Sequence, residues 1–377
     1  MKGFLKPRYT QSVNDLMVLW FEPSNQYTIV DNGLFFCLQT YFDTDTEKQC
    51  VSLYKKQFQL SSVQAEQLLN DVEKFLTDRN SNIIEESIAQ LDHPIEKPNY
   101  VLTKYYSSSK KIFCINYESE DLLTYIHPQL AHLETTKYSK TDFYFNLSIK
   151  NNLHLLYKND VFVRAFPTNH YHKLQGRIYM ELINALHNKV NHDWIGVFHA
   201  STVSNNRDSV MLIGQSGSGK STFTTLLTCS GYSLIADDNT PLLNTDFNVY
   251  HLPNAISTKE GAFNTLRAYI PNIDELENNH LRAYKGAIKY IPALTPDKLQ
   301  VPCKTLVLIN YQKDAATELK RINAKKALEI LIPDSWISPK PENAKAFLEW
   351  LTTLSFYKLT YSNNEDAILK FRSILPI

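Results

Sequence analysis

The sequence predicts an α/β protein preceded by a small α+β unit, and three patterns indicate this class. An apolar run, Val210 to Ile213, leads through a glycine-rich turn into a segment with helical spacing. A second apolar run, Ser233 to Ala236, ends in a pair of aspartates. From about residue 197 onward, strand-like and helix-like segments alternate, which is typical of a sheet covered by helices.

The composition excludes several classes of protein. A chain of 377 residues exceeds one core of typical size, so two or three domains are expected. Lys and Arg together number 39, as do Asp and Glu, which leaves no overall charge to attract nucleic acid or an acidic membrane. The five cysteines are widely spaced, which indicates a reducing compartment rather than a disulfide framework. We therefore expect a cytoplasmic protein that binds neither nucleic acid nor a membrane.

Residues 1–80 are expected to form the small α+β unit. Two apolar stretches between residues 16 and 30 flank a polar turn, which predicts a hairpin. Ser or Thr followed three residues later by Glu or Gln predicts the starts of two helices: Thr44 with Glu47, and Ser61 with Gln64. Apolar residues at helical spacing follow each pair, so both segments are expected to be amphipathic.

A polar connection with two prolines, residues 81–99, predicts a linker and the first domain boundary. The remaining chain, residues 100–377, is expected to be one larger domain. Its first part, residues 100–190, has strand-like runs broken by Asn-rich turns and then a helix. Its second part, residues 195–377, contains the alternating strands and helices and is expected to hold the functional site.

The segment from Gly214 to Ser221 has the spacing of a phosphate-binding loop, a glycine, four residues and then Gly-Lys-Ser. Only ten of the 377 residues are glycine, and three of them fall in this segment. Such a loop turns its backbone N–H groups inward, the lysine binds the β- and γ-phosphates, and the serine binds the accompanying metal. The residues expected to contact a nucleotide are Gly214, Ser216, Gly217, Ser218, Gly219, Lys220, Ser221 and Thr222. The alternative is a tight turn with an exposed lysine.

Asp237 and Asp238 follow an apolar strand, at the end where α/β sheets bind their ligands. One carboxylate can hold Mg²⁺, and the other can accept a proton from an attacking hydroxyl. A turn or helix cap is the alternative for either residue. His199 lies in the run Val197 to Ser201, which is expected to be a strand beside the loop strand, where a core histidine is the alternative role.

The segment from His199 to Asp238 resembles the catalytic core of the HPr kinase/phosphorylase family, a P-loop fold of the PEP carboxykinase type. The resemblance implies that Lys220 and the loop amides bind ATP, and that Ser221 and Asp237 lie near Mg²⁺. It also implies that Asp238 or its neighbour is the base, with His199 beside it. Lys259, in a proline-lysine stretch like that of peptide-kinase relatives, becomes a further candidate for binding phosphate.

Thr222 departs from the HPr kinases, which carry an acidic residue after the loop serine. An arginine-bearing signature near the C-terminus of those enzymes has no counterpart that we identify here. The closer resemblance is to HPr-kinase-like enzymes of peptide natural-product pathways. HPr as the acceptor and the reverse, phosphorolytic reaction are therefore not expected to carry over.

The N-terminal unit resembles the PqqD-like fold, a winged-helix module that recognises the leader peptides of ribosomally made peptides. The resemblance rests on the strand-turn-strand segment at 16–30, the turn at 31–33 and the aromatic helix that contains Phe35, Phe36 and Tyr41. A winged helix can also bind DNA, but residues 1–80 carry eight basic and ten acidic side chains, a net charge of −2 that opposes this. A purely structural or dimerising unit is the alternative.

The sequence therefore predicts an ATP- and Mg²⁺-dependent kinase. Its expected acceptor is a serine or threonine hydroxyl of a precursor peptide or small protein in ribosomal peptide biosynthesis, delivered by the N-terminal unit. A small-molecule kinase of the same fold and an NTP-hydrolysing regulatory switch remain as alternatives. The sequence leaves open the acceptor, the choice between ATP and GTP, the separate roles of the two aspartates, and the oligomeric state, including a homo-oligomer.

Overall fold

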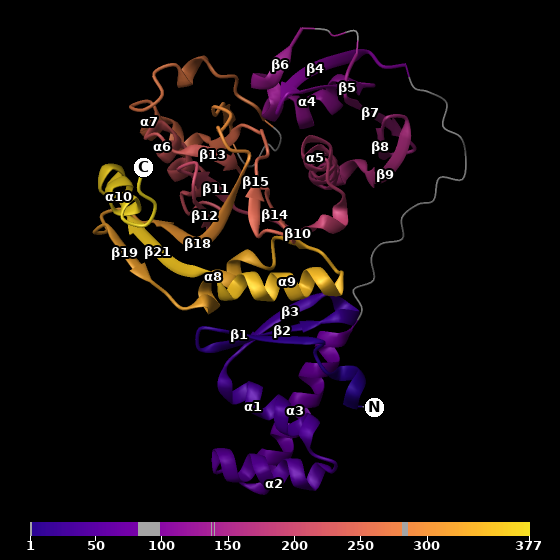
Figure 1. Cartoon of the computed structure of the whole chain (residues 1–377), viewed down its shortest axis with the longest axis vertical. Coiled ribbons are helices and arrows are strands. Elements are labelled where there is room, and N and C mark those ends of the chain that lie inside the picture. The colour runs from indigo at the N-terminus through magenta and orange to yellow at the C-terminus, as the bar shows by residue number, and fades with distance from the viewer. Residues whose placement is uncertain (1, 82–98, 137, 139, 281–285) are drawn as a thin grey trace.

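The computed structural model of the chain describes residues 2–81, 99–136, 138, 140–280 and 286–377 (Figure 1). It has the mixed α/β architecture that the sequence predicts, with several sheets and their covering helices. The predicted linker, residues 81–99, lies almost entirely outside the described residues. Within the described residues, none of the helices has both the length and the apolar character needed to cross a membrane.

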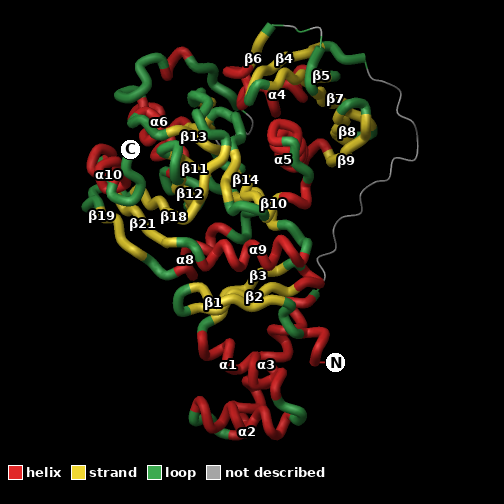
Figure 2. Tube along the Cα trace, viewed as in Figure 1, coloured by secondary structure: helices red, strands yellow, loops and turns green. Residues whose placement is uncertain are grey.

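The N-terminal unit is an antiparallel sheet in the order β1-β2-β3, followed by three helices. Its elements are β1 (Tyr9–Val13), β2 (Leu16–Phe21), β3 (Gln26–Val30), α1 (Asn32–Asp43), α2 (Glu47–Phe58) and α3 (Ser62–Asn80). Figure 2 shows these helices on one side of the sheet and helix α9 (Pro341–Thr352) on the other. The predicted hairpin is confirmed, since β2 from Met17 to Phe21 pairs with the whole of β3.

Helix starts in this unit follow from side-chain capping. The predicted capping box at Ser61 is confirmed. The one predicted at Thr44 is wrong, because the Thr44 hydroxyl donates to the backbone carbonyl of Thr40 (2.8 Å) where α1 ends. The box is formed two residues later by Thr46 and Gln49, so α2 begins at the second of two overlapping patterns.

The β-rich part of the chain is a separate six-stranded sheet in the order β6-β4-β5-β7-β8-β9. Its elements are β4 (Leu102–Ser108), β5 (Lys111–Tyr117), α4 (Glu120–Leu130), β6 (Glu134–Thr135), β7 (Phe143–Lys150), β8 (Leu153–Lys158), β9 (Val161–Pro167) and α5 (Tyr171–His187). The sequence predicts strands and the helix α5 here but not α4, because Pro128 interrupts its helical pattern.

The second part of the large domain is a ten-stranded sheet with helices on both sides (Figure 1). Its strands are β10 (Trp194–Phe198), β11 (Ser201–Ser204), β12 (Ser209–Ile213), β13 (Ser233–Ala236), β14 (Thr240–Leu243), β15 (Asn248–Tyr250), β18 (Gln300–Tyr311), β19 (Glu318–Arg321), β20 (Trp336–Ile337) and β21 (Ser355–Tyr361). Its helices are α6 (Lys220–Cys229), α7 (Phe263–Leu266), α8 (Ala324–Leu331), α9 and α10 (Asn364–Arg372). A separate two-stranded antiparallel sheet consists of β16 (Ile256–Lys259) and β17 (Ile288–Ile291).

The order of strands brings distant segments to one edge of this sheet. β12 pairs in parallel with β18, and β18 pairs in parallel with β21. β11 is antiparallel to both β12 and β13, so β13 runs in the same direction as β12. The ends of β13, β12, β18 and β21 and the start of β11 therefore lie along one edge, which we call the carboxyl edge.

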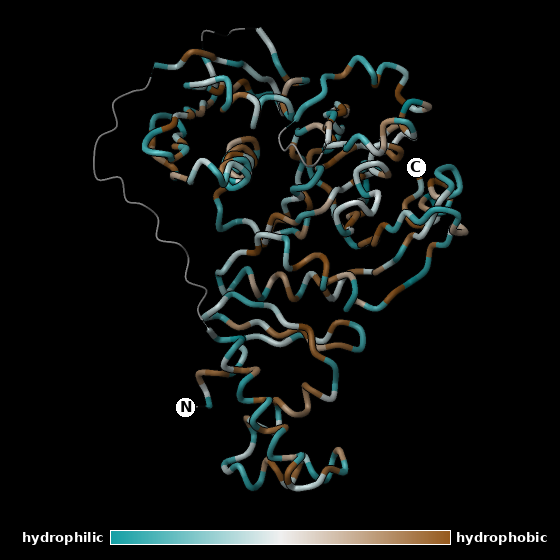
Figure 3. The backbone as a smooth tube through the Cα atoms, turned by 180° about the vertical axis from the view of Figure 1, so that it is seen from behind, coloured by the Kyte–Doolittle hydropathy of each residue, from teal (hydrophilic) through white to brown (hydrophobic). Residues whose placement is uncertain are grey.

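The N-terminal sheet and the large domain share one hydrophobic core. Val18 and Trp20 of β2 belong to the same buried cluster as Phe347 and Leu348 of α9. Tyr27 of β3 meets Phe347 edge to face, with 4.9 Å between ring centroids. Figure 3 shows hydrophobic and hydrophilic residues alternating along α9, as expected for a helix with one buried face.

Candidate functional site

The loop between β12 and α6 lies at the carboxyl edge and needs glycine at two positions. A Cβ atom at Gly214 would lie 2.3 Å from the Ser218 hydroxyl and 3.2 Å from the backbone carbonyl oxygen of Ile309. Gly219 has a φ of +92°, and a Cβ there would lie 3.0 Å from Cβ of Tyr311. The backbone therefore curls more tightly here than residues with side chains allow.

The same loop leaves polar groups available for a ligand. Gly219 is the N-cap of α6 and supplies no side-chain cap, so the N–H groups of the first helical turn have no intrahelical partner. The Ser218 hydroxyl is buried and has no hydrogen-bond partner within the described part of the chain. An uncapped helix N-terminus and an unpartnered hydroxyl beside it together fit a phosphate group.

Lys220, the first residue of α6, connects the loop to the two aspartates. Its side chain is buried, and its ammonium donates to Asp238 Oδ1 and, at 3.2 Å, to the Ser201 hydroxyl. Burial works to lower the pKa of Lys220, but the negative charges of Asp238 and Asp237 outweigh it and raise this pKa. Lys220 is thus a charged group buried among acids.

Asp237 is fully buried and is held by several donors. The Ser201 hydroxyl donates to its Oδ1, and the backbone N–H of Ser257 donates to its Oδ2 (2.9 Å). The side chain of Asn254 donates to its backbone carbonyl at 3.0 Å. Burial, followed by the charge of Asp238, raises the pKa of Asp237 to about 6.

Asp238 differs from its neighbour in exposure, charge and backbone conformation. Its side chain is 34% exposed, while Asp237 is 0% exposed. Burial opposes its ionisation, but Lys220 and then His199 outweigh this effect and lower the pKa of Asp238. Its φ is +59°, a left-handed conformation that side-chain-bearing residues rarely adopt outside functional or turn positions.

His199 and Lys259 complete the set of candidate residues. His199 is exposed in a bend between β10 and β11, where its backbone N–H donates to the Ser335 hydroxyl (3.1 Å). The predicted strand is therefore interrupted at His199, which faces solvent near Asp238 instead of the core. The Lys259 ammonium at the end of β16 donates to the Ser216 hydroxyl of the loop at 2.9 Å.

Three residues that position the aspartates escape sequence reasoning: Ser201, Asn254 and Ser257. Ser201 comes two residues after His199 and begins β11, and this closeness to a candidate residue is the one sequence signal that could have identified it. Asn254 and Ser257 lie in the proline-lysine stretch that ends at Lys259. Their contacts depend on how the sheet of β16 and β17 lies against the carboxyl edge, which no local sequence pattern encodes.

A magnesium ion would find only part of its coordination shell in the protein. Among the described residues, no three His, Cys, Asp or Glu side chains gather to hold a metal. Ser221 lies in the first turn of α6, one residue after Lys220, whose ammonium contacts the Asp238 carboxylate. A hydroxyl and one carboxylate fit a hard cation that takes its remaining oxygens from phosphates and water.

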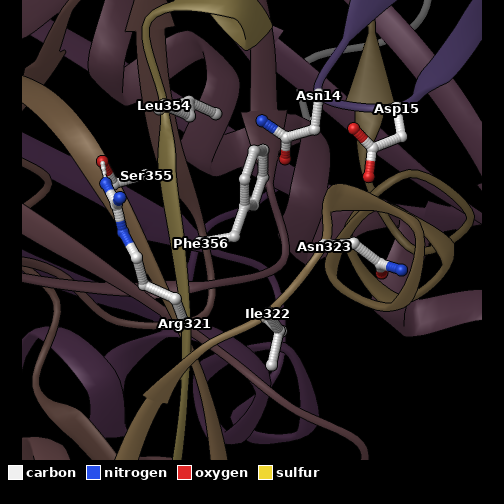
Figure 4. Close-up of a pocket in the computed structure, with 8 residues that line it drawn as sticks. All are labelled: Asn14, Asp15, Arg321, Ile322, Asn323, Leu354, Ser355 and Phe356. Carbon is white, nitrogen blue, oxygen red and sulfur yellow. Dashed lines mark hydrogen bonds between the residues drawn. The ribbon is translucent and has the colours of Figure 1, made fainter.

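A pocket of about 320 Å³ lies elsewhere, between the N-terminal sheet and the opposite edge of the large sheet (Figure 4). It is lined by Asn14, Asp15, Arg321, Ile322, Asn323, Leu354, Ser355 and Phe356. Ser355 begins β21 and Tyr361 ends it, so at about 3.3 Å per residue the pocket is roughly 20 Å from the carboxyl edge. This pocket is separate from the residues around Lys220.

The structure thus brings together the predicted loop, both aspartates, His199 and Lys259 at one edge of an α/β sheet. Comparison of the chain with protein-family models and with curated protein sequences gives no match.

Proposed function

We propose that the chain is an ATP- and Mg²⁺-dependent kinase with a P-loop fold of the HPr-kinase type. Its acceptor is a serine or threonine hydroxyl of a precursor peptide or small protein, in the biosynthesis of ribosomally made peptides. The observation that carries this proposal is the shared cluster of Lys220, Asp237 and Asp238. The Lys220 ammonium contacts Asp238 directly and shares the Ser201 hydroxyl with Asp237, so a lysine at the loop lies beside the two acids that phosphoryl transfer can use.

Asp238 is the proposed base because its side chain can reach solvent and Asp237 cannot. In the transfer, the acceptor hydroxyl loses its proton to Asp238 while its oxygen bonds to the γ-phosphorus. The bond from that phosphorus to the β–γ bridging oxygen breaks and ADP leaves. Positioning and charge stabilisation supply most of the acceleration in such reactions.

Lys220 is proposed to exchange partners when ATP binds. Its ammonium contacts Asp238 in the free protein, and the same ammonium is the loop's charge for the β- and γ-phosphates. Once Lys220 moves to the phosphates, Asp238 loses the main group that lowers its pKa. The base then becomes stronger only when the phosphate donor is present.

Ser221 and Asp237 are proposed to hold Mg²⁺, which neutralises developing charge on the β- and γ-phosphates. Ser201 and the Ser257 N–H each donate to one oxygen of Asp237 and so fix the direction of its carboxylate. His199 and the Lys259 ammonium lie at the rim of the same site.

The N-terminal unit is proposed to recognise the acceptor peptide as a PqqD-like module. Its sheet ends in two unpaired edge strands, β1 and β3, within the described residues. A peptide can bind such an edge by adding a strand, which needs main-chain hydrogen bonds and no basic surface. The net charge of −2 over residues 1–80 is compatible with this mode and unfavourable for DNA.

Lys220→Ala tests the proposal. We expect the variant to lose transfer of labelled γ-phosphate, because the other ammonium described at the loop, that of Lys259, contacts Ser216 and not the acids. Far-ultraviolet circular dichroism checks that the variant is folded, since loss of the buried Lys220–Asp238 pair lowers its stability. Candidate acceptors are short peptides encoded beside this gene that contain serine or threonine. Lys313→Ala, at an exposed lysine, is the matched control and should retain activity.

The form of the product distinguishes the proposal from its alternatives. Phosphopeptide formation supports a peptide kinase. Release of inorganic phosphate at the same rate with and without peptide would instead indicate a hydrolytic switch. Full transfer activity in Lys220→Ala would contradict the proposal altogether.

A further inference from the structure

The order of strands at the carboxyl edge places different strands on the two sides of the phosphate loop. Along this edge the order is β13, β11, β12, β18, β21. Asp237 and Asp238 follow β13, on one side of the loop. On the other side the first strand is β18, which ends in Tyr311. A triphosphate on the loop with its terminal group toward the acids must direct its nucleoside toward β18.

β18 extends past the loop strand at this point. Leu308 pairs with Ile213, the last residue of β12, and β18 continues through Tyr311. The backbone N–H of Tyr311 donates to the carbonyl of Ser218 at 2.9 Å. The position a Cβ would take at Gly219 is 3.0 Å from Cβ of Tyr311. Tyr311 is thus hydrogen-bonded through its backbone to the phosphate loop and packs against it.

The ring of Tyr311 is both supported and accessible. It packs edge to face on Tyr361, with 5.6 Å between ring centroids and 74° between ring planes. Tyr361 is buried at 1% exposure, while Tyr311 is 50% exposed. A large aromatic side chain held from behind and open to solvent beside a phosphate loop offers a flat apolar surface to a base.

We propose that Tyr311 is the stacking platform for the purine base of the nucleoside triphosphate, an inference that rests on the proposed function. The loop itself contacts only phosphates, so it cannot distinguish ATP from inorganic polyphosphate. By stacking on the base, Tyr311 makes the site bind a nucleoside triphosphate more tightly than an inorganic polyphosphate. Because stacking uses the face of the ring, the phenolic hydroxyl is not required.

Calorimetric titration with Mg-ATP and with Mg-tripolyphosphate tests this inference. We expect wild-type protein to bind Mg-ATP more tightly than Mg-tripolyphosphate. Tyr311→Ala should weaken Mg-ATP binding by about tenfold and leave Mg-tripolyphosphate binding unchanged, since loss of one base-stacking contact has an effect of this order. Tyr311→Phe should bind both ligands as the wild type does, and so should Tyr138→Ala, a control at a tyrosine that is 41% exposed.

Two results would overturn the inference while leaving the kinase proposal intact. In one, Tyr311→Ala binds Mg-ATP as tightly as wild type. In the other, it loses both ligands equally, which would mean that Tyr311 only supports the loop through Ser218. If wild-type protein bound neither ligand, the proposed function itself would fail and the inference with it.

Discussion

At the scale of single residues, the proposed chemistry depends most on the pairing of Lys220 with Asp238. Both groups are charged in the free protein, because each shifts the pKa of the other toward the ionised form. In the proposed function, the ion pair would compete with a triphosphate for the same ammonium. Asp238 is at once the proposed base and a competitor for Lys220.

Asp238→Asn tests this dual role. Removal of the charge frees Lys220, so we expect Mg-ATP to bind at least as tightly as to the wild type, while phosphoryl transfer falls by at least about 100-fold, the usual effect of losing a general base. Calorimetry and labelled transfer measure the two effects. If Asp238→Asn lost Mg-dependent binding of ATP and Asp237→Asn kept it, Asp238 would be the magnesium ligand and Asp237 the base.

Residue-scale reasoning from sequence succeeds where chemistry is local. The glycines, Lys220 and Ser221 lie within one short turn, and the conformations they need can be inferred from their types. Ser201 and Ser257 escaped prediction because they position Asp237 across 36 and 20 residues of chain. Serine is common in strands and turns, so only the folded arrangement distinguishes these two.

At the scale of elements, the segment from β15 to β16 connects the core to the acids. His251 is buried, and its Nδ1 donates to the backbone carbonyl of Ile235 at 3.0 Å, two residues before Asp237. Its Nε2 is buried without a partner in the described part of the chain. Burial lowers the pKa of His251 from 6.5 to about 4. The folded state therefore holds this imidazole neutral.

His251→Asn is expected to flatten the dependence of stability on pH. In the wild type, the unfolded chain takes up a proton on His251 below pH 6.5 and the folded chain resists it, so acid favours unfolding. Removing this histidine should reduce the fall in the free energy of unfolding between pH 7 and pH 5 by about 2 kcal/mol. Urea denaturation at both pH values measures this difference.

Asp237 changes the stability of the fold with pH in the opposite direction to His251, over a similar range of pH. Its raised pKa means that the folded protein keeps a proton that the unfolded chain has lost, so acid favours folding between its ordinary pKa and about 6. The two effects partly cancel in the wild type. The comparison must therefore be between wild type and variant, and equal slopes for the two would contradict a buried neutral His251.

Elements were predictable to the extent that their signals are local. The strand before the phosphate loop, α6, the hairpin and the capping box at Ser61 follow from apolar spacing and capping residues. α4 escaped prediction because Pro128 lies inside it, and α2 was predicted to begin at the wrong threonine. The order of strands in the ten-stranded sheet depends on non-local pairing, which spacing does not encode.

At the scale of the whole molecule, α9 joins the N-terminal unit to the ten-stranded sheet. Phe347 contacts Tyr27 of the N-terminal sheet and Phe198 of β10, with ring centroids 4.9 Å and 5.8 Å away. Both faces of the small sheet are therefore covered, one by its own helices and one by α9. Such a unit is expected to unfold together with the large domain.

Phe347→Ala tests this joint unfolding. The side chain is fully buried, so its removal is expected to lower the free energy of unfolding by about 3–5 kcal/mol. Tryptophan fluorescence and far-ultraviolet circular dichroism should show one shared transition that moves to lower denaturant. Phe4→Ala, at a residue that is 88% exposed, should leave it in place. A separate, unshifted transition of the N-terminal unit would indicate two independent units.

In the proposed function, the loop around Gly217 binds a triphosphate whose terminal phosphate lies beside Asp237 and Asp238. The most direct measurement is calorimetric titration of wild type and Lys220→Ala with Mg-ATP. We predict saturable heat with one nucleotide per chain for the wild type, and none for the variant at the same concentrations. No heat from the wild type, or equal binding by both proteins, would contradict the account.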